Sequence, residues 1–111
     1  MLRALAVINE KIDFDAIYAQ SDSMATGARL ALNKAGISPK DKIIVGIDYI
    51  REAQQAIKSG NQAASFLYPT CAKEAADIVL KILHGKRVPK KIHVKSKLIT
   101  KENVNKVFPI F

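Results

Sequence analysis

The feature that most constrains this chain is a regular alternation of helix-like and strand-like segments along its length. Amphipathic or alanine-rich stretches predict helices over residues 2–10, 24–36, 49–60 and 70–85, and short apolar runs predict strands over residues 15–19, 42–48, 62–69 and 92–99. Short connections between such segments imply right-handed crossovers and neighbouring parallel strands. We therefore predict an α/β fold with a mostly parallel sheet that is flanked by helices on both faces.

Glycines and small polar residues mark the ends of the predicted helices. Gly36, Gly60 and Gly85 each follow the last apolar position of a helix, where a residue with a left-handed backbone commonly ends it. Ser23 and Thr70 stand where N-caps are expected. The helical period predicts that the following residues face inward: Met24, Ala28, Leu32 and Ala35, then Ala53, Ala56 and Ile57, and finally Ala72, Ala75, Ala76, Val79, Leu80 and Leu83.

Two of the predicted strands carry signals about their place in the sheet. The branched apolar run over residues 42–48 is typical of a strand buried on both faces of a parallel sheet. Residues 92–99 alternate in polarity and carry lysines, which is typical of an edge strand whose charge discourages pairing with another molecule.

Length and composition describe a single globular domain. The 111 residues are 49% hydrophobic and 25% charged, which suits one hydrophobic core. No apolar run approaches the roughly 20 residues that a transmembrane helix needs. Cys71 is the one cysteine, so an internal disulfide is excluded, and His84 and His93 lack the spacing of a metal site. We therefore predict no metal and no cofactor.

The net charge of +8 is concentrated near the carboxy terminus. Residues 86–111 hold eight basic side chains and Glu102, which gives +7, so the first 85 residues carry only +1. The two aromatic residues of this region, Phe108 and Phe111, are not interleaved with the basic ones, and no helix-turn-helix or RNA-recognition pattern is present. This pattern favours a solvated basic surface over nucleic-acid binding.

Polar side chains follow each of the first three predicted strands. Because ligands of open parallel sheets bind at the carboxyl ends of the strands, we expect these side chains to converge on one ligand site. Short polar groups and an aromatic ring suit a neutral polyhydroxyl ligand, whereas the glycine pattern of a phosphate loop is absent. The strand-end residues are Gln20, Ser21 and Asp22, then Asp48 and Tyr49, and then Tyr68, Pro69 and Thr70.

Each of these positions also has a purely structural interpretation, which the sequence leaves open. Asp22 or Ser23 can serve as a helix N-cap, and Asp48 can stabilise its turn. Tyr68 can be a core aromatic with its hydroxyl at the surface, and Cys71 a buried small side chain rather than a reactive thiol.

No catalytic set is evident in the sequence. A serine paired with a histidine, a nucleophile elbow and a metal-ligand cluster are all missing. Asp22 and Asp48 would form a carboxylate pair if their strands are neighbours, so a hydrolase stays open as a minor alternative. We predict that this segment is not an enzyme.

Four segments of the chain resemble a known family in their order and spacing. They read IDFDAIYAQSDSMATGARLALNKAG, KIIVGIDYI, AIKSGNQAASFLYPT and EAADIVLKILHGKRVP. Together they resemble the carboxy-terminal portion of type I periplasmic sugar-binding proteins of the ribose-binding class, from about residue 3 to residue 107. That class shares its fold with the effector domains of lac-repressor-type regulators, so the resemblance implies half of a periplasmic-binding-protein type I fold.

The resemblance also implies which residues contact the ligand. In this family the first strand ends in an Asn-Asp pair whose Asn contacts the ligand, and Ser21 followed by Asp22 occupies these positions. The family's Gly-x-Asp, whose Asp accepts hydrogen bonds from sugar hydroxyls, is matched by residues 46–48. A polar residue at the third strand end is matched by Tyr68. The predicted ligand-binding residues are therefore Ser21, Asp22, Asp48 and Tyr68.

Smaller signals separate the branches of the family. The run FLYPT followed by KEA resembles the periplasmic sensor portions of hybrid two-component histidine kinases, whereas LITKENV is similar to sequences in importer proteins. We therefore predict a sugar-binding part of a two-subdomain periplasmic receptor that signals to a histidine kinase. The alternatives are the substrate-binding protein of a sugar ABC importer, the effector domain of a lac-repressor-type regulator and a Rossmann-like enzyme, the last opposed by the missing glycine fingerprint.

The same resemblance implies that residues 1–111 are a partial carboxy-terminal subdomain. The expected partners are a sugar, an amino-terminal subdomain that this segment lacks, and a membrane kinase or importer. Half of a cleft cannot bury the 70% or more of a ligand's surface that tight sites bury. We therefore expect the isolated segment to bind sugar weakly or not at all and to self-associate through surfaces that the other half would cover.

Overall fold

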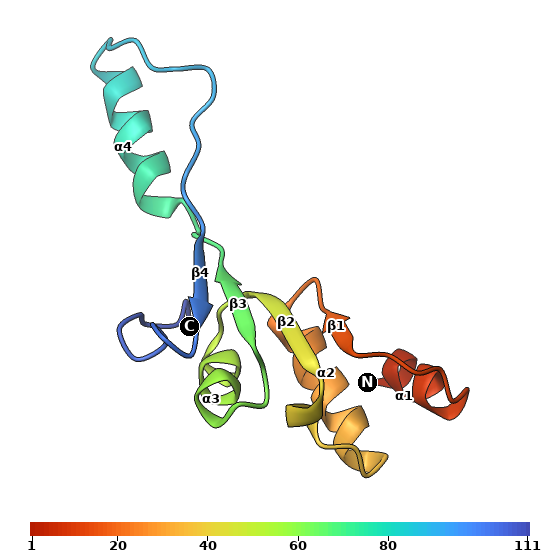
Figure 1. The fold of residues 1–111 in the computed structure, drawn as a ribbon. Helices are drawn as coiled ribbons and strands as arrows, with labels where there is room; N and C mark the ends of the chain where they lie inside the picture. Colours follow the sequence, from red (N-terminus) through yellow and green to blue (C-terminus); the bar gives the residue numbers. More distant parts are fainter.

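The computed structural model describes residues 1–111, and its helices and strands alternate in the predicted order (Figure 1). The predicted order of elements is confirmed, although the last strand begins only at Lys97 rather than at residue 92. The elements are α1 (Leu2–Asn9), β1 (Ala16–Tyr18), α2 (Asp22–Lys34), the short 3-10 helix η1 (Pro39–Asp41), β2 (Ile43–Asp48), α3 (Arg51–Ser59), β3 (Ala64–Leu67), α4 (Ala72–Leu83) and β4 (Lys97–Thr100).

The four strands form one mostly parallel sheet in the order β1-β2-β3-β4, which confirms the predicted α/β class with a mostly parallel sheet. β1, β2 and β3 are parallel neighbours, and β4 runs antiparallel to β3. Tyr18 pairs with Val45, and Asp48 pairs with Leu67. β4 lies at the edge of the sheet with Lys97 at its start, as its lysines indicated.

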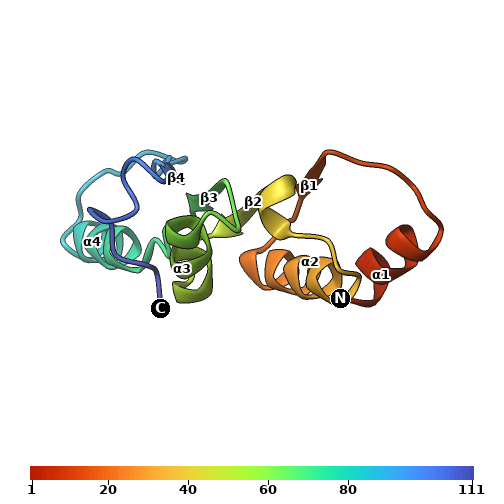
Figure 2. The same cartoon turned by 60° about the horizontal axis from the view of Figure 1, so that its bottom comes forward.

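Helices α2 and α3 pack on one face of this sheet (Figure 2), whereas helices on both faces were predicted. One core cluster joins Ala19, Ala25, Leu32 and Ile44, and a second joins Tyr49, Ile57, Ile99 and Val104. The opposite face is open, and its apolar side chains Tyr18, Ile43, Phe66 and Leu98 are between 45% and 66% exposed. The run over residues 42–48, expected to be buried on both faces, is therefore buried on one.

Helix α4 stands apart from the body, beyond the carboxyl end of β3 (Figure 1). It contains no buried residue, and Val79, Leu80 and Leu83 are 54%, 54% and 75% exposed. The prediction that its apolar positions face inward was wrong for this chain. Its helical period marks an apolar stripe, but no other segment of the chain packs against that stripe.

The helix ends follow the predicted chemistry with two shifts. Gly36, Gly60 and Gly85 all have positive φ and follow helix ends as expected. α2 begins earlier than predicted, so its N-cap is Ser21 rather than Ser23. As a result Ala25 is buried, while Met24, which was expected to face inward, is 59% exposed. The N-cap position of α4 is Cys71 rather than Thr70, and no side-chain hydrogen bond caps that helix.

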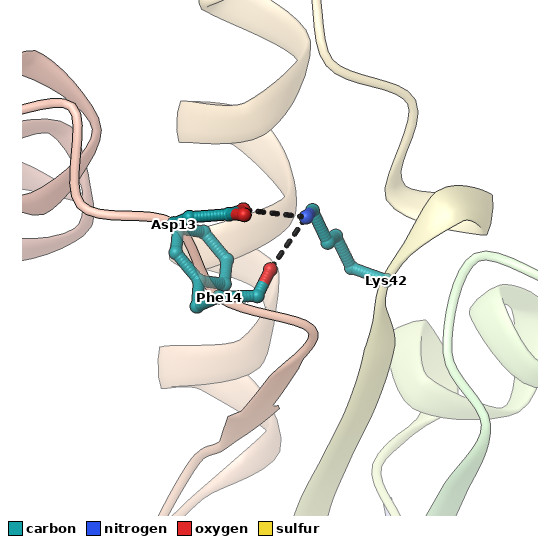
Figure 3. Close-up of polar contacts among 3 residues, drawn as sticks. All are labelled: Asp13, Phe14 and Lys42. Atoms are coloured by element: carbon teal, nitrogen blue, oxygen red, sulfur yellow. Dashed lines mark hydrogen bonds and ion pairs between the residues drawn. The ribbon is translucent and has the colours of Figure 1, made fainter.

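Lys42, just before β2, contacts the segment before β1 at the amino end of the sheet. Figure 3 shows Lys42 reaching the segment before β1, where its ammonium donates to the Phe14 carbonyl and lies 3.9 Å from an Asp13 carboxylate oxygen. The same nitrogen lies 5.0 Å from the centre of the Phe14 ring. Because Asp13 is fully exposed, the ion pair itself stabilises the fold little.

Candidate functional site

The predicted ligand residues lie at the carboxyl end of the three parallel strands. Tyr18 of β1 pairs with Val45 of β2. Ser21 lies three residues after Tyr18, and Asp48 lies three residues after Val45. Tyr68 directly follows the last residue of β3. The parallel register therefore brings all three to one edge of the sheet, as the strand pattern predicted. No hydrogen bond joins them to one another.

Ser21 is held at this edge as the N-cap of α2. Its backbone is extended, with φ of −151°, and its Oγ accepts a hydrogen bond from Met24 N at 3.2 Å. The hydroxyl proton is not used in this bond, so Ser21 keeps one donor for a ligand. A direct contact between Ser21 and a sugar stays a prediction.

Asp22 differs in position from the other predicted ligand residues because it is fully buried. One carboxylate oxygen accepts from Tyr49 N at 2.7 Å and from Ser65 Oγ at 2.6 Å, and the other accepts from Gln62 Nε2 at 2.8 Å. Both oxygens are thus occupied by groups of the chain itself, and the side chain presents no surface to solvent.

Asp48 is half-buried and begins a turn with an unusual backbone. Its φ is +103°, and the φ of Tyr49 is +60°, both in the region that L-residues rarely adopt. Such residues cost about 1 to 3 kcal/mol each and persist where the surroundings hold them, often at functional sites. Burial of the carboxyl group and, second, the charge of Asp22 raise the pKa of Asp48 above its ordinary value.

Tyr49, the residue after Asp48, also holds this turn in place, which the sequence did not reveal. Its ring is fully buried, and its hydroxyl donates to the carbonyls of Val104 at 3.2 Å and Val107 at 2.9 Å. Its own carbonyl accepts from Ile110 N at 3.0 Å. The carboxy-terminal segment is therefore bonded to the same turn that carries Asp48, a contact more than 50 residues away along the chain and without a local sequence signal.

Tyr68 lies between β3 and α4, and its side chain is 63% exposed. The alternative that it is a core aromatic does not apply in this chain. An exposed ring with a hydroxyl is suited to pack on the apolar face of a sugar ring and to hydrogen-bond a sugar hydroxyl.

The resemblance implies a sugar contact at Tyr68, and on that expectation Tyr68→Ala in the full-length protein should weaken sugar binding by about 1 to 3 kcal/mol, because the substitution removes both the ring contact and the hydroxyl. Titration calorimetry measures the change, and Tyr68→Phe separates the two contributions. Unchanged affinity in Tyr68→Ala would remove this residue from the site.

Two cavities of the chain lie elsewhere, beside β1. Two apolar cavities of about 410 and 650 Å³ lie between α1, β1 and α2, and Ile17 and Tyr18 line both. Ser21, Asp48 and Tyr68 line neither of them. The predicted ligand edge therefore lies outside both of these cavities.

The side chains and helices also bear on metal, membrane and nucleic-acid sites. No group of three or more His, Cys, Asp or Glu residues is placed to hold a metal ion. The helices are all too short or too polar to cross a membrane. The basic side chains of residues 86–97 are all exposed, on the loop after α4 and at the start of β4.

Comparison with known proteins gives consistent matches. A family model described as a periplasmic binding protein domain matches residues 2–87. A putative rhizopine-binding protein of Rhizobium meliloti is 37% identical over 95 residues, covering 84% of this chain and 31% of that protein. The ribose import binding protein RbsB of Bacillus subtilis is 38% identical over 95 residues, covering 81% of this chain and 29% of that protein.

Solved structures agree with the sequence matches. The fructose-binding periplasmic domain of a hybrid two-component system superposes with a TM-score of 0.84 at 26% identity, covering 95% of this chain and 36% of that one. The chain spans about a third of the length of these relatives. The matched family model covers most of the chain, and the sheet has the register that aligns the predicted ligand residues. The chain belongs to the periplasmic binding protein family.

Proposed function

We propose that this chain forms part of the carboxy-terminal subdomain of a two-subdomain periplasmic receptor that binds a sugar or similar polyhydroxyl molecule. Ser21, Asp48 and Tyr68 supply the contacts from this half. The observation that carries the proposal is the position of Asp48, a carboxylate on a positive-φ turn at the carboxyl edge of the sheet. The names of the relatives, which refer to ribose, rhizopine and fructose, support the same ligand class.

The open surfaces of the chain fit a second subdomain. The exposed sheet face with Tyr18 and Phe66, and the apolar stripe of α4 with Val79 and Leu83, are the kind of surface that monomeric proteins rarely leave uncovered. We infer that the amino-terminal subdomain covers part of these surfaces. A sugar held between the two halves would favour the closed form, because its contacts are complete only there.

A membrane partner would recognise the closed form of the two subdomains. We favour a two-component histidine kinase, because the run FLYPT resembles sensor sequences and because a hybrid two-component system has a domain of this fold. An ABC importer is the second candidate, supported by the ribose import relative. Sugar-dependent autophosphorylation of a kinase and sugar-dependent stimulation of a transport ATPase distinguish the two, and a helix-turn-helix in the same protein would instead indicate a repressor.

Titration calorimetry of the full-length protein against a small panel tests the proposed ligand class. D-ribose, D-fructose and myo-inositol represent polyhydroxyl ligands, and L-leucine serves as a control of similar size. We expect at least one polyhydroxyl compound to bind in the micromolar range or tighter and leucine not to bind. Binding of leucine alone, or of no compound in a panel widened to other pentoses and hexoses, would contradict the proposal.

Sugar binding should weaken on acidification at a higher pH than an ordinary aspartate would cause. The pKa of Asp48 is raised by burial and by Asp22, so its carboxylate begins to protonate while ordinary aspartates are still ionised. Protonation removes acceptor capacity for sugar hydroxyls, so affinity falls as pH falls through the Asp48 pKa. Calorimetry across the acidic range measures this, and Asp48→Asn should lose the dependence; an equal dependence in Asp48→Asn assigns it to another group.

The 111-residue chain alone should self-associate, because the open sheet face exposes Ile43, Phe66 and Leu98. Sedimentation velocity over a range of concentrations should show association, and Phe66→Lys should shift it toward monomer. Leu30→Lys is the matched control, since Leu30 is 54% exposed on α2, away from that face. A monomer at every concentration would show that the open face does not drive association.

A further inference from the structure

Asp22 is the most fully enclosed charged side chain at the carboxyl edge of the sheet. It is 0% exposed, and its three hydrogen-bond donors come from three different parts of the fold. Tyr49 N belongs to the turn after β2, Ser65 Oγ belongs to β3, and Gln62 Nε2 belongs to the segment before β3. The carboxylate therefore links the amino end of α2 to the turn after β2, to β3 and to the segment before β3.

A second layer of polar contacts holds this carboxylate in place. Gln62 also donates to Ala64 O at 3.0 Å and accepts from the Arg29 guanidinium, which in turn donates to Thr26 Oγ1 at 2.7 Å. Arg29 brings a positive charge toward the buried carboxylate. No buried side-chain polar atom of the chain lacks a partner, so the network is complete. Complete buried networks favour one arrangement of the groups they join.

The backbone beneath Asp22 has no room for a side chain. A Cβ on Gly46 would lie 2.1 Å from Asp22 Oδ1 and 3.2 Å from Gln62 Nε2. Because Gly46 has no side chain, the Asp22 carboxylate can lie against β2 at this point and accept the hydrogen bond from Tyr49 N in the turn that follows. This close approach explains a glycine inside a buried strand by geometry.

The turn after β2 is the part of the fold that most needs such support. Asp48 and Tyr49 both have positive φ, which L-residues adopt at a cost. Tyr49 N donates to Asp22 Oδ2 at 2.7 Å and to Ser65 Oγ at 3.1 Å. Side chains of α2 and β3 therefore hold this amide in place. The carboxylate of Asp22 is the stronger of these two acceptors, because hydrogen bonds to ionised groups are stronger than neutral ones.

We propose that Asp22 is a positioning residue, which holds the Tyr49 amide and thereby fixes the strained backbone that carries Asp48 in the orientation for ligand binding. The role rests on the proposed function, in which Asp48 accepts from sugar hydroxyls. It takes the place of the direct contact predicted for Asp22, because a carboxylate with no exposed surface and with both oxygens bonded has no free atom for a ligand.

Two readouts on the full-length protein test this role, with D-ribose and D-fructose as probes. Asp22→Ala should raise the Kd for the sugar that binds by about 10-fold or more, and it should speed hydrogen exchange at the Tyr49 amide by a similar factor. Leu32→Ala is the control, since Leu32 is a fully buried residue of the same helix without polar contacts. It should lower the melting temperature but leave both the Kd and the Tyr49 exchange within about twofold.

The outcomes separate positioning from the alternatives. If Asp22→Ala raises the Kd while Tyr49 exchange stays as in wild type, Asp22 acts by contact and the positioning role is overturned. If neither value changes, or if Leu32→Ala changes the Kd as much, the role is also overturned. Wild-type protein that binds no sugar overturns the proposed function, and Tyr49 exchange then decides by itself whether Asp22 holds the turn. If Asp22→Ala does not fold, Asp22→Asn, which keeps one acceptor oxygen, takes its place with an intermediate effect expected.

Discussion

Replacing Asp48 with alanine in the full-length protein is expected to weaken sugar binding by about 100-fold or more. A carboxylate that accepts from sugar hydroxyls contributes about 1.5 to 3 kcal/mol per hydrogen bond, and no neighbouring acidic group can substitute because Asp22 is buried and fully bonded. Titration calorimetry with the sugar identified from the panel measures the loss. The melting temperature should change little by comparison, since Asp48 makes no side-chain hydrogen bond within the chain.

Two further variants make this result specific. Asp41→Ala removes an exposed aspartate in η1, before the opposite end of β2, and should leave the affinity unchanged. Asp48→Asn tests the positive φ of this position, because asparagine tolerates such a backbone better than alanine does. If Asp48→Asn binds like wild type while Asp48→Ala does not, the negative charge is not needed, and the loss comes from the missing acceptor oxygen or from backbone strain.

Replacing Gly46 with alanine should destabilise the fold by about 2 to 3 kcal/mol and weaken sugar binding as well. The added Cβ would lie 2.1 Å from Asp22 Oδ1, so the buried carboxylate must move away from Gln62 or Tyr49 and leave a buried donor unpaired. Urea unfolding gives the change in stability through the midpoint and slope of the transition. Calorimetry on the same protein gives the affinity.

A double-mutant cycle identifies the cause of this loss. In an Asp22→Ala background the carboxylate that meets the new methyl group is absent, so Gly46→Ala should cost much less than it does in wild type. Equal costs in both backgrounds would show that the alanine disturbs the strand itself and not Asp22. The cycle requires only relative stabilities, and both residues are in direct contact, where coupling is expected.

The order of elements could be predicted because its signals are local. Apolar periodicity and glycine positions mark where each helix and strand begins and ends within a few residues, and Gly60, with φ of +80°, ends α3 where the pattern placed it. Parallel strands align their carboxyl ends, so the strand pattern alone was enough to place Asp48 and Ser21 at one edge of the sheet. The exception is the final strand, where the alternating polarity of residues 92–96 extends beyond the part that pairs with β3.

The face that each element buries depended on packing. Periodicity showed that α4 has an apolar stripe with Val79 and Leu83, but a stripe does not specify the surface that covers it, and this chain contains none. For the same reason, the branched run of β2 did not reveal that only Ile44, and not Ile43, is buried.

The division of roles between Ser21 and Asp22 shows the same limit at the site. Both are small polar residues at a strand-to-helix junction, and either is a suitable N-cap by type. The hydroxyl of Ser21 caps the helix three residues ahead, whereas the carboxylate of Asp22 bonds groups that are 27, 40 and 43 residues distant in sequence. Partners at such separations are set by strand register and helix packing, which local pattern does not encode.

The sequence by itself determined the alternating fold, the resemblance to sugar-binding receptors and the position of Asp48 at a strand end, because each depends on residue type and short-range spacing. Only the tertiary structure decided that the Asp48 turn is held from two sides, by Asp22 through the Tyr49 amide and by the carboxy-terminal segment through the Tyr49 hydroxyl and carbonyl. The physical reason is that a buried hydrogen bond is defined by which groups meet in space, and those groups lie far apart along the chain.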